Sequence, residues 1–133
     1  MQTAQKLYEA GHITYMRTDS VTLSNTALES IEKAISKKFG SNYFQSRVFS
    51  NKNKNAQQAH EAVRPTNFLK NIQNLDADQT NLYDLIWRRT VASQMSDAKV
   101  DKTTVKIKSS KHDGIFQSDG EVIKFDGFLK LYI

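Results

Sequence analysis

The chain has 133 residues, of which 38% are hydrophobic and 25% charged, as is usual for a globular protein. This length suits one domain, or a piece of something larger, and is sufficient to bury a core. Cysteine is absent, which excludes disulfides and thiolate metal sites and fits a reducing cytoplasm. With no apolar stretch of membrane-spanning length and no signal peptide, the sequence predicts a soluble intracellular protein that contacts no membrane.

The net charge is +5, and the sequence pI is near 9.4. The positive excess is concentrated in the first half: residues 1–66 hold nine Lys/Arg against five Asp/Glu, and residues 67–133 hold ten against nine. Such a charge is compatible with binding to nucleic acid, whose phosphates attract Lys and Arg. Charge alone is a weak indication, since many basic domains bind no nucleic acid.

The N-terminal residues predict a helix, a short β-prone run and a turn. Residues 2–10 are good helix formers, and Gly11 is a favoured residue just past a helix end. Residues 12–16 favour a strand, and the polar residues 17–20 favour a turn. The first helix has no capping residue other than Met1, which suggests that the chain begins inside a larger protein.

A second helix is predicted over residues 25–39, with Ser24 as N-cap and Gly40 closing it. Its apolar residues recur at helical spacing: Leu28, Ile31, Ile35 and Phe39. Residues 41–58 are polar, with Asn and Lys enriched at 51–55, and predict a loop. A short helical turn is expected at 57–63, before Pro65.

A third helix is predicted to start at Asp76 or Asp78, to run to about Ser96, and to direct Arg88 and Arg89 outward. The side chains expected to be buried are Leu82, Leu85, Ile86 and Trp87.

From about residue 99 the pattern becomes that of β structure. Residues 103–108 alternate with period two, as do parts of 114–118 and 121–132. The turn signals between these runs are Asp113-Gly114, Asp119-Gly120 and Asp126-Gly127. The sequence therefore predicts an α+β fold, mainly α. A helical domain over residues 1–98 is followed by the start of an antiparallel β region over 99–133, and each is expected to be truncated at its outer end.

Tyr15 and Arg17 form the first candidate site, between the β-prone run and the turn. A tyrosine oxygen can attack phosphorus, but its ordinary pKa near 10 means that it needs a neighbouring cation or base. In a strand Arg17 would lie on the same face and could hold a phosphate in bidentate fashion. A Tyr-x-Arg spacing is also common by chance, so core or surface roles stay open.

His60 and Arg64 form the second candidate. Four residues apart on a helical turn, they would share one side and could contact a phosphate. A histidine with satisfied hydrogen bonds beside an exposed arginine is the structural alternative. No His/Asp/Glu cluster has metal-ligand spacing, and there is no Gly-rich phosphate loop.

Three segments in order resemble bacterial type IA DNA topoisomerases, in the topoisomerase I branch. Residues 7–20 resemble the active-site segment, residues 58–66 a second motif, and residues 82–89 with 91–95 the helix that follows. Residues 125–128 also fit the family pattern. The resemblance covers essentially the whole chain.

The resemblance implies an isomerase that relaxes negatively supercoiled DNA without ATP. Tyr15 would cut one strand and remain joined to its 5′-phosphate while the other strand passes through the gap. Arg17 would position the scissile phosphate and help to activate the nucleophile. His60 would contact the DNA backbone, and Arg64 would support that side of the DNA-binding site. Asp19 and Ser20 would only shape the turn.

The same resemblance implies a Mg²⁺ cofactor in the full-length enzyme, bound by an N-terminal Toprim domain that nothing here matches. No metal site is therefore expected in this chain, and by itself it is expected neither to cleave nor to relax DNA. The expected partners are single-stranded DNA at the cleavage site and the Toprim and gate domains of the parent chain, in the cytoplasm and associated with the nucleoid. Residues 1–98 would form the movable tyrosine-bearing domain and residues 99–133 part of the arch.

Two other classes remain as alternatives. A topoisomerase III-type decatenase usually has Pro in place of Met16 and differs around Glu61 and Arg64, and reverse gyrase shares the same core. A non-catalytic domain that binds single-stranded nucleic acid would use Tyr15 as a stacking platform.

Overall fold

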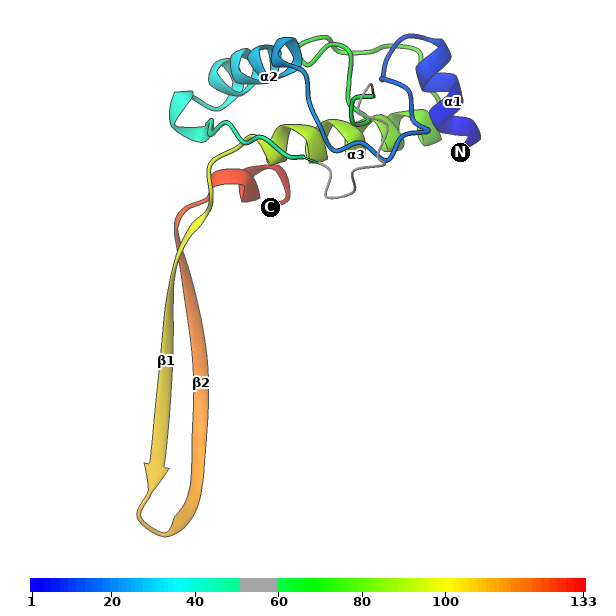
Figure 1. Ribbon diagram of the computed structural model, residues 1–133. Coiled ribbons are helices and arrows are strands. Elements are labelled where there is room, and N and C mark those ends of the chain that lie inside the picture. The colour runs from blue at the N-terminus through cyan, green and yellow to red at the C-terminus, as the bar shows by residue number, and fades with distance from the viewer. Residues whose placement is uncertain (51–59) are drawn as a thin grey trace. The chain divides into compact units, whose positions relative to one another are not determined.

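The computed structural model describes residues 1–50 and 60–133, which form two compact units, Met1–Ser96 and Asp97–Ile133 (Figure 1). The first unit holds the helices α1 (Gln2–Glu9), α2 (Asn25–Lys38) and α3 (Ala77–Ser93), with a short 3₁₀ turn, η1 (Ser41–Tyr43). The second unit holds the strands β1 (Lys99–Ser109) and β2 (His112–Phe125), followed by a 3₁₀ turn, η2 (Gly127–Leu131). The prediction of an α+β fold with an antiparallel β region is confirmed.

The helix boundaries follow the capping residues of the sequence. The Ser24 hydroxyl accepts a hydrogen bond from the Ala27 N–H at the start of α2. Asp76, not Asp78, caps α3: its carboxylate accepts from the Gln79 N–H at 2.8 Å, and the Gln79 side chain accepts from the Asp76 N–H at 3.2 Å. Gly11 and Gly40 follow α1 and α2 with φ of +77° and +107°, a conformation that favours glycine.

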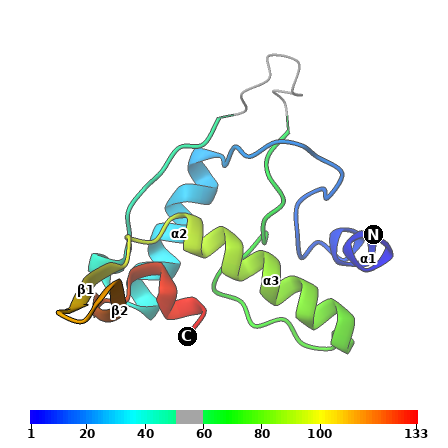
Figure 2. The same cartoon turned by 90° about the horizontal axis from the view of Figure 1, so that it is seen from below.

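The core of the first unit lies where α1 and the segment after it meet α3. Figure 2 shows α1 near the N-terminal end of α3 and α2 toward its other end. One buried cluster contains Ala4, Leu7, Ile13, Met16 and Tyr83. The expectation that Leu85 is buried is wrong, since its side chain is 55% exposed. Tyr83, Thr90 and Val91 are the buried residues of α3 and fall on one helical face, whereas Leu85 falls outside it.

The predicted strand at residues 12–16 is reduced to one antiparallel bridge, between Ile13 and Pro65. The Thr14 N–H donates to the Arg64 carbonyl at 2.9 Å, and the Thr66 N–H donates to the His12 carbonyl at 3.0 Å. The pairing stays short because the two N–H groups that could extend it are used elsewhere: the Arg64 N–H donates to the Thr14 hydroxyl, and the His12 N–H donates to the Leu7 carbonyl. The predicted helical turn at 57–63 is wrong for residues 60–63, which are not helical. Residues 57–59 and the Asn/Lys-rich stretch 51–55 lie outside the described residues.

The second unit is a long two-stranded hairpin with Ser110 and Lys111 at its tip. Its register pairs Ile107 with Phe116 and Val105 with Ser118. Asp113-Gly114 and Asp119-Gly120 therefore lie inside β2, and the prediction that they form turns is wrong because cross-strand pairing overrides their local preference. The third predicted turn is present, with Gly127 at φ +50° opening η2.

In the part of the chain that the structure describes, no helix combines the length and apolarity required to cross a bilayer.

Candidate active site

Tyr15 lies at the surface on a backbone that is anchored on both sides. Ile13 and Met16 are buried in the core cluster, whereas the Tyr15 side chain is 40% exposed. The ring of Tyr8 on α1 meets the Tyr15 ring edge-on, with centroids 5.2 Å apart and planes at 64°. The buried neighbours fix where the segment runs, while Tyr15 itself stays partly exposed to solvent.

Thr14, the residue before Tyr15, joins the first candidate segment to the second. Its hydroxyl donates to the Ala62 carbonyl at 2.9 Å and accepts from the Arg64 N–H at 2.9 Å. On the other side of the bridge, the Thr66 hydroxyl donates to the Gly11 carbonyl at 2.6 Å. The structure therefore holds residues 62–66 directly beside residues 11–14.

The Arg64 side chain is held by hydrogen bonds to neighbouring residues of the second segment. Its Nε and Nη2 donate to the two carboxylate oxygens of Glu61 at 2.7 and 3.1 Å, and its Nη1 donates to the Pro65 carbonyl at 3.1 Å. The Arg64 side chain is only 15% exposed. The Arg64 guanidinium lowers the pKa of Glu61, and a further hydrogen bond from the Ser24 N–H acts in the same direction. Glu61 thus links the second segment to the start of α2.

His60 is exposed at the first described residue after the gap. The expected helical relationship between His60 and Arg64 is absent, because residues 60–64 are not helical. The two side chains therefore do not share one helix face, and of the two only Arg64 has hydrogen-bond partners among the described residues.

Arg17 is exposed and lines an open hollow of about 630 Å³ beside α1, together with Met1, Gln2, Gln5 and Lys6. Among the described residues its guanidinium has no hydrogen-bond or ion-pair partner. The segment that carries Tyr15 and Arg17 is irregular, so the strand argument for a shared face does not apply, although both side chains are exposed.

The turn after Arg17 is shaped by short-range hydrogen bonds. Thr18 Oγ1 accepts from the Ser20 N–H at 3.1 Å, and Ser20 Oγ accepts from the Thr22 N–H at 3.2 Å. Ser20 is buried and Asp19 exposed.

Magnesium would require a group of oxygen ligands. Across residues 1–50 and 60–133, no three His, Cys, Asp or Glu side chains are grouped closely enough to hold a metal ion. The described residues therefore offer no magnesium site built from three such side chains.

Sequence reasoning missed Thr14 and Glu61, the two side chains that connect the candidate residues. Both lie inside the segments that carried the family resemblance, but nothing local indicates that Thr14 contacts residues 62 and 64 or that Glu61 contacts Ser24.

Comparison with known proteins gives a consistent result. The model of the DNA topoisomerase family matches residues 1–133. The protein named DNA topoisomerase 1 from Streptomyces coelicolor is 50% identical over 141 residues, covering 100% of this chain and 15% of that protein. DNA topoisomerase 1 from Rickettsia bellii is 45% identical over 146 residues, covering 99% of this chain and 18% of that protein.

The structure of full-length topoisomerase I from Thermotoga maritima superposes with a TM-score of 0.84 and 33% identity, covering 99% of this chain and 22% of that one. The chain thus spans less than a quarter of the length of each of these relatives. With the family model matching every residue and the relatives agreeing, the chain belongs to the DNA topoisomerase family, beside the bacterial topoisomerase I proteins.

Proposed function

We propose that this chain supplies the DNA-cleaving nucleophile, Tyr15, of an ATP-independent type IA topoisomerase that relaxes negatively supercoiled DNA. The observation that carries the proposal is the exposed Tyr15 phenol on a backbone fixed by Ile13, Thr14 and Met16. A nucleophile must be reachable by DNA and held in one place, because positioning supplies much of the rate in such reactions.

In the proposed reaction, Tyr15 Oη gives up its proton and forms a bond to the scissile phosphorus. The bond between that phosphorus and the 3′-oxygen of the preceding nucleotide breaks, and the oxygen leaves as a 3′-hydroxyl after taking a proton. The phosphodiester linkage to tyrosine replaces the one in DNA, so the 3′-hydroxyl can reverse the attack without ATP after strand passage. Arg17 would hold the phosphate and stabilise the charge that develops on it, which its guanidinium permits because it has no partner among residues 1–50 and 60–133.

His60 is proposed to contact the DNA backbone near the cleavage point, which its exposure allows. Arg64 would act mainly through its ion pair with Glu61, keeping the second segment against the Tyr15 segment, because three of its five N–H donors already have partners within residues 61–65. We propose that the full-length enzyme uses magnesium and binds it in a domain outside this chain; among the described residues, no group of three His, Cys, Asp or Glu side chains could hold a metal ion.

The test uses the full-length enzyme that carries this segment, a single-stranded oligonucleotide labelled at its 3′ end, and denaturant to stop the reaction. We expect the label to transfer to the protein, and Tyr15→Phe to abolish the transfer. Tyr8→Phe is the matched control, since it removes the hydroxyl of the neighbouring ring and leaves an aromatic ring against Tyr15. Transfer from a 5′-labelled strand alone would contradict the 5′-phosphotyrosine linkage.

Two alternative functions, a binding domain for single-stranded nucleic acid and a topoisomerase III-type enzyme, are tested by related measurements. If Tyr15→Phe leaves cleavage intact but weakens single-strand affinity, Tyr15 is a stacking platform in a binding domain. If the enzyme unlinks catenated circles in preference to relaxing supercoiled plasmid, it belongs to the topoisomerase III type. We further propose that the 133-residue chain alone does not relax plasmid DNA, and relaxation by the purified chain would disprove this.

A further inference from the structure

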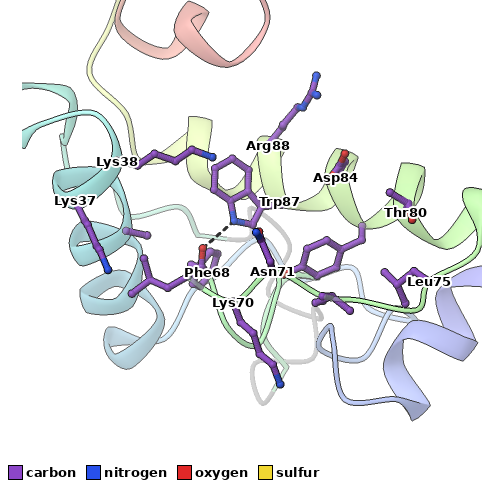
Figure 3. A pocket seen from close by; sticks show the side chains of 14 residues that line it. Lys37, Lys38, Phe68, Lys70, Asn71, Leu75, Thr80, Asp84, Trp87 and Arg88 are labelled. Carbon is purple, nitrogen blue, oxygen red and sulfur yellow. Dashed lines mark hydrogen bonds between the residues drawn. The ribbon is translucent and has the colours of Figure 1, made fainter.

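A groove that no step of the proposed reaction uses lies within the first unit, between the C-terminal end of α2, residues 68–72 and α3 (Figure 3). Its volume is about 700 Å³. None of its lining residues belongs to the Tyr15 segment 11–20 or to residues 60–66. We call it the basic groove, and its charged and aromatic lining includes Lys37, Lys38, Phe68, Lys70, Trp87 and Arg88.

The basic groove carries an uncompensated positive charge. Four cations line it, Lys37, Lys38, Lys70 and Arg88, against one acidic side chain, Asp84. Within the described part of the chain, none of the four cations has an ion-pair partner. Lysines in the last turn of α2 also stabilise the helix dipole, but this role does not account for Lys70 or Arg88.

Lys38 and Trp87 contact each other in the basic groove. The indole Nε1 of Trp87 donates to the Phe68 carbonyl at 3.2 Å, which fixes the ring. The Lys38 ammonium lies 4.6 Å from the centroid of the same ring. Figure 3 shows this side chain reaching from α2 toward the indole. A cation held over an aromatic face keeps its N–H donors available to an anion.

The arrangement of the other cations indicates the shape of the ligand. Lys37, Lys70 and Arg88 come from three different segments, and Arg88 points to the opposite side of the basic groove from Lys37 and Lys70 (Figure 3). They do not converge on one point, as they would around a single compact phosphate. The positive charges are spread along the basic groove, and its lining also includes Phe68, Ile72 and Tyr83. A ligand that matches both features is an extended polyanion with apolar faces.

We propose that the basic groove binds a segment of single-stranded DNA, with Lys38 and its neighbouring cations on the phosphates and the apolar lining against the bases. This site is separate from the reaction assigned to Tyr15, and it would hold a strand without cutting it. Backbone contacts of this kind give affinity without sequence selectivity.

Trp87 is the only tryptophan of the chain and therefore reports on the basic groove directly. The 133-residue chain is titrated with a fluorescein-labelled 20-nucleotide oligothymidine, and in parallel with the unlabelled strand while tryptophan emission is recorded. We expect Trp87 emission to change with the same dissociation constant that fluorescence anisotropy gives. Binding seen by anisotropy with no change in Trp87 emission would overturn the proposal.

The variant Lys38→Gln/Lys70→Gln removes two phosphate contacts. We expect a clear loss of affinity, and a slope of log K against log salt that is shallower by about 1.4, because each contact on a single strand contributes about 0.7. The control Lys33→Gln/Lys111→Gln removes the same charge at exposed positions outside the groove and should leave the slope unchanged. Circular dichroism melting verifies that both variants fold. An equal loss in both variants would mean non-specific attraction and would disprove the site.

Further measurements identify the class of ligand and distinguish groove binding from the reaction proposed for Tyr15. If tripolyphosphate changes Trp87 emission to saturation and competes fully with the strand, the groove is a compact-anion site and the proposal fails. If a duplex of the same length binds more tightly than the single strand, the proposal also fails. Tyr15→Phe should leave the Trp87 signal unchanged, so loss of covalent transfer and loss of groove binding are read independently.

Discussion

The Thr14 hydroxyl accepts a hydrogen bond of 2.9 Å from the backbone N–H of Arg64, fifty residues away in sequence. The same hydroxyl donates to the Ala62 carbonyl, and the backbones of Thr14 and Arg64 are joined by a second bond of 2.9 Å. The residue that precedes the candidate nucleophile is thus fixed from the other candidate segment. Any displacement of residues 62–66 would be transmitted to Tyr15 through this connection.

Thr14→Val keeps the shape of the side chain but removes its hydroxyl. We expect a loss of about 1–2 kcal/mol in the free energy of unfolding, because the Arg64 N–H and the Ala62 carbonyl each lose a partner in a half-buried site. Urea denaturation of the 133-residue chain measures this change. Thr14→Ser retains the hydroxyl and should recover most of the loss, whereas destabilisation by Ser but not by Val would point to methyl packing instead.

Glu61 should make the stability of the first unit depend on acid pH. Its pKa in the folded chain lies below the ordinary value of 4.5, mainly because Arg64 donates to its carboxylate. The unfolded chain therefore binds more protons in this range, so the stabilisation is complete above the unfolded pKa and is lost as pH falls through the folded one. Glu61→Gln should lower stability by about 1 kcal/mol at pH 7 and have a smaller effect at pH 3.

Urea denaturation of the unsubstituted chain and of the Glu61→Gln variant between pH 3 and pH 7 measures the difference in their free energies of unfolding. A constant difference between them would show that the ionised carboxylate is not responsible. Asp119, whose pKa is also lowered by hydrogen bonds from Thr104 and Gln117, is present in both proteins and cancels in the comparison.

Gln94 is a second internal connection that we expect to be important for stability. It is fully buried at the end of α3, where its Oε1 accepts from the Arg47 N–H at 2.9 Å and its Nε2 donates to the Arg47 carbonyl at 3.0 Å. Gln94→Leu preserves volume but leaves these backbone groups without their amide partner, at a cost of about 1–3 kcal/mol. Thermal unfolding measures the loss, and Gln73→Leu at an exposed position is the control. Similar melting temperatures for the two variants would contradict this role.

The capping box of α3 offers a matched pair of substitutions. Asp76→Ala removes the side chain that accepts from the Gln79 N–H and should cost about 1 kcal/mol. Asp78→Ala removes an acidic residue from the same first turn, but one that is not the cap, and should cost less. Chemical denaturation of both variants tests the assignment, and an equal effect would mean that charge near the helix N-terminus matters more than the cap.

The sequence alone predicted the features that depend on neighbouring residues. Ser24 and Asp76 start their helices because their side chains can reach an N–H only three residues ahead, and Gly11 and Gly40 end helices because glycine adopts positive φ without strain. The period-two pattern after residue 99 predicted antiparallel strands for a similarly local reason. The family resemblance of residues 7–20 and 58–66 also needed no structure.

Only the tertiary structure decided which residues meet. The pairing of Ile13 with Pro65, the hydrogen bonds of Thr14 to residues 62 and 64, and the hydrogen bond from the Ser24 N–H to Glu61 all join positions far apart in sequence, whose contact depends on how the intervening chain folds. The Asp-Gly pairs at 113–114 and 119–120 also could not be assigned from sequence alone, because cross-strand hydrogen bonds outweigh their local preference for a turn. The free energy of a helix cap is set by a few adjacent atoms, whereas packing and long-range hydrogen bonds depend on the whole chain. The surroundings of Tyr15 are made by such packing and long-range hydrogen bonds, so only the tertiary structure shows them.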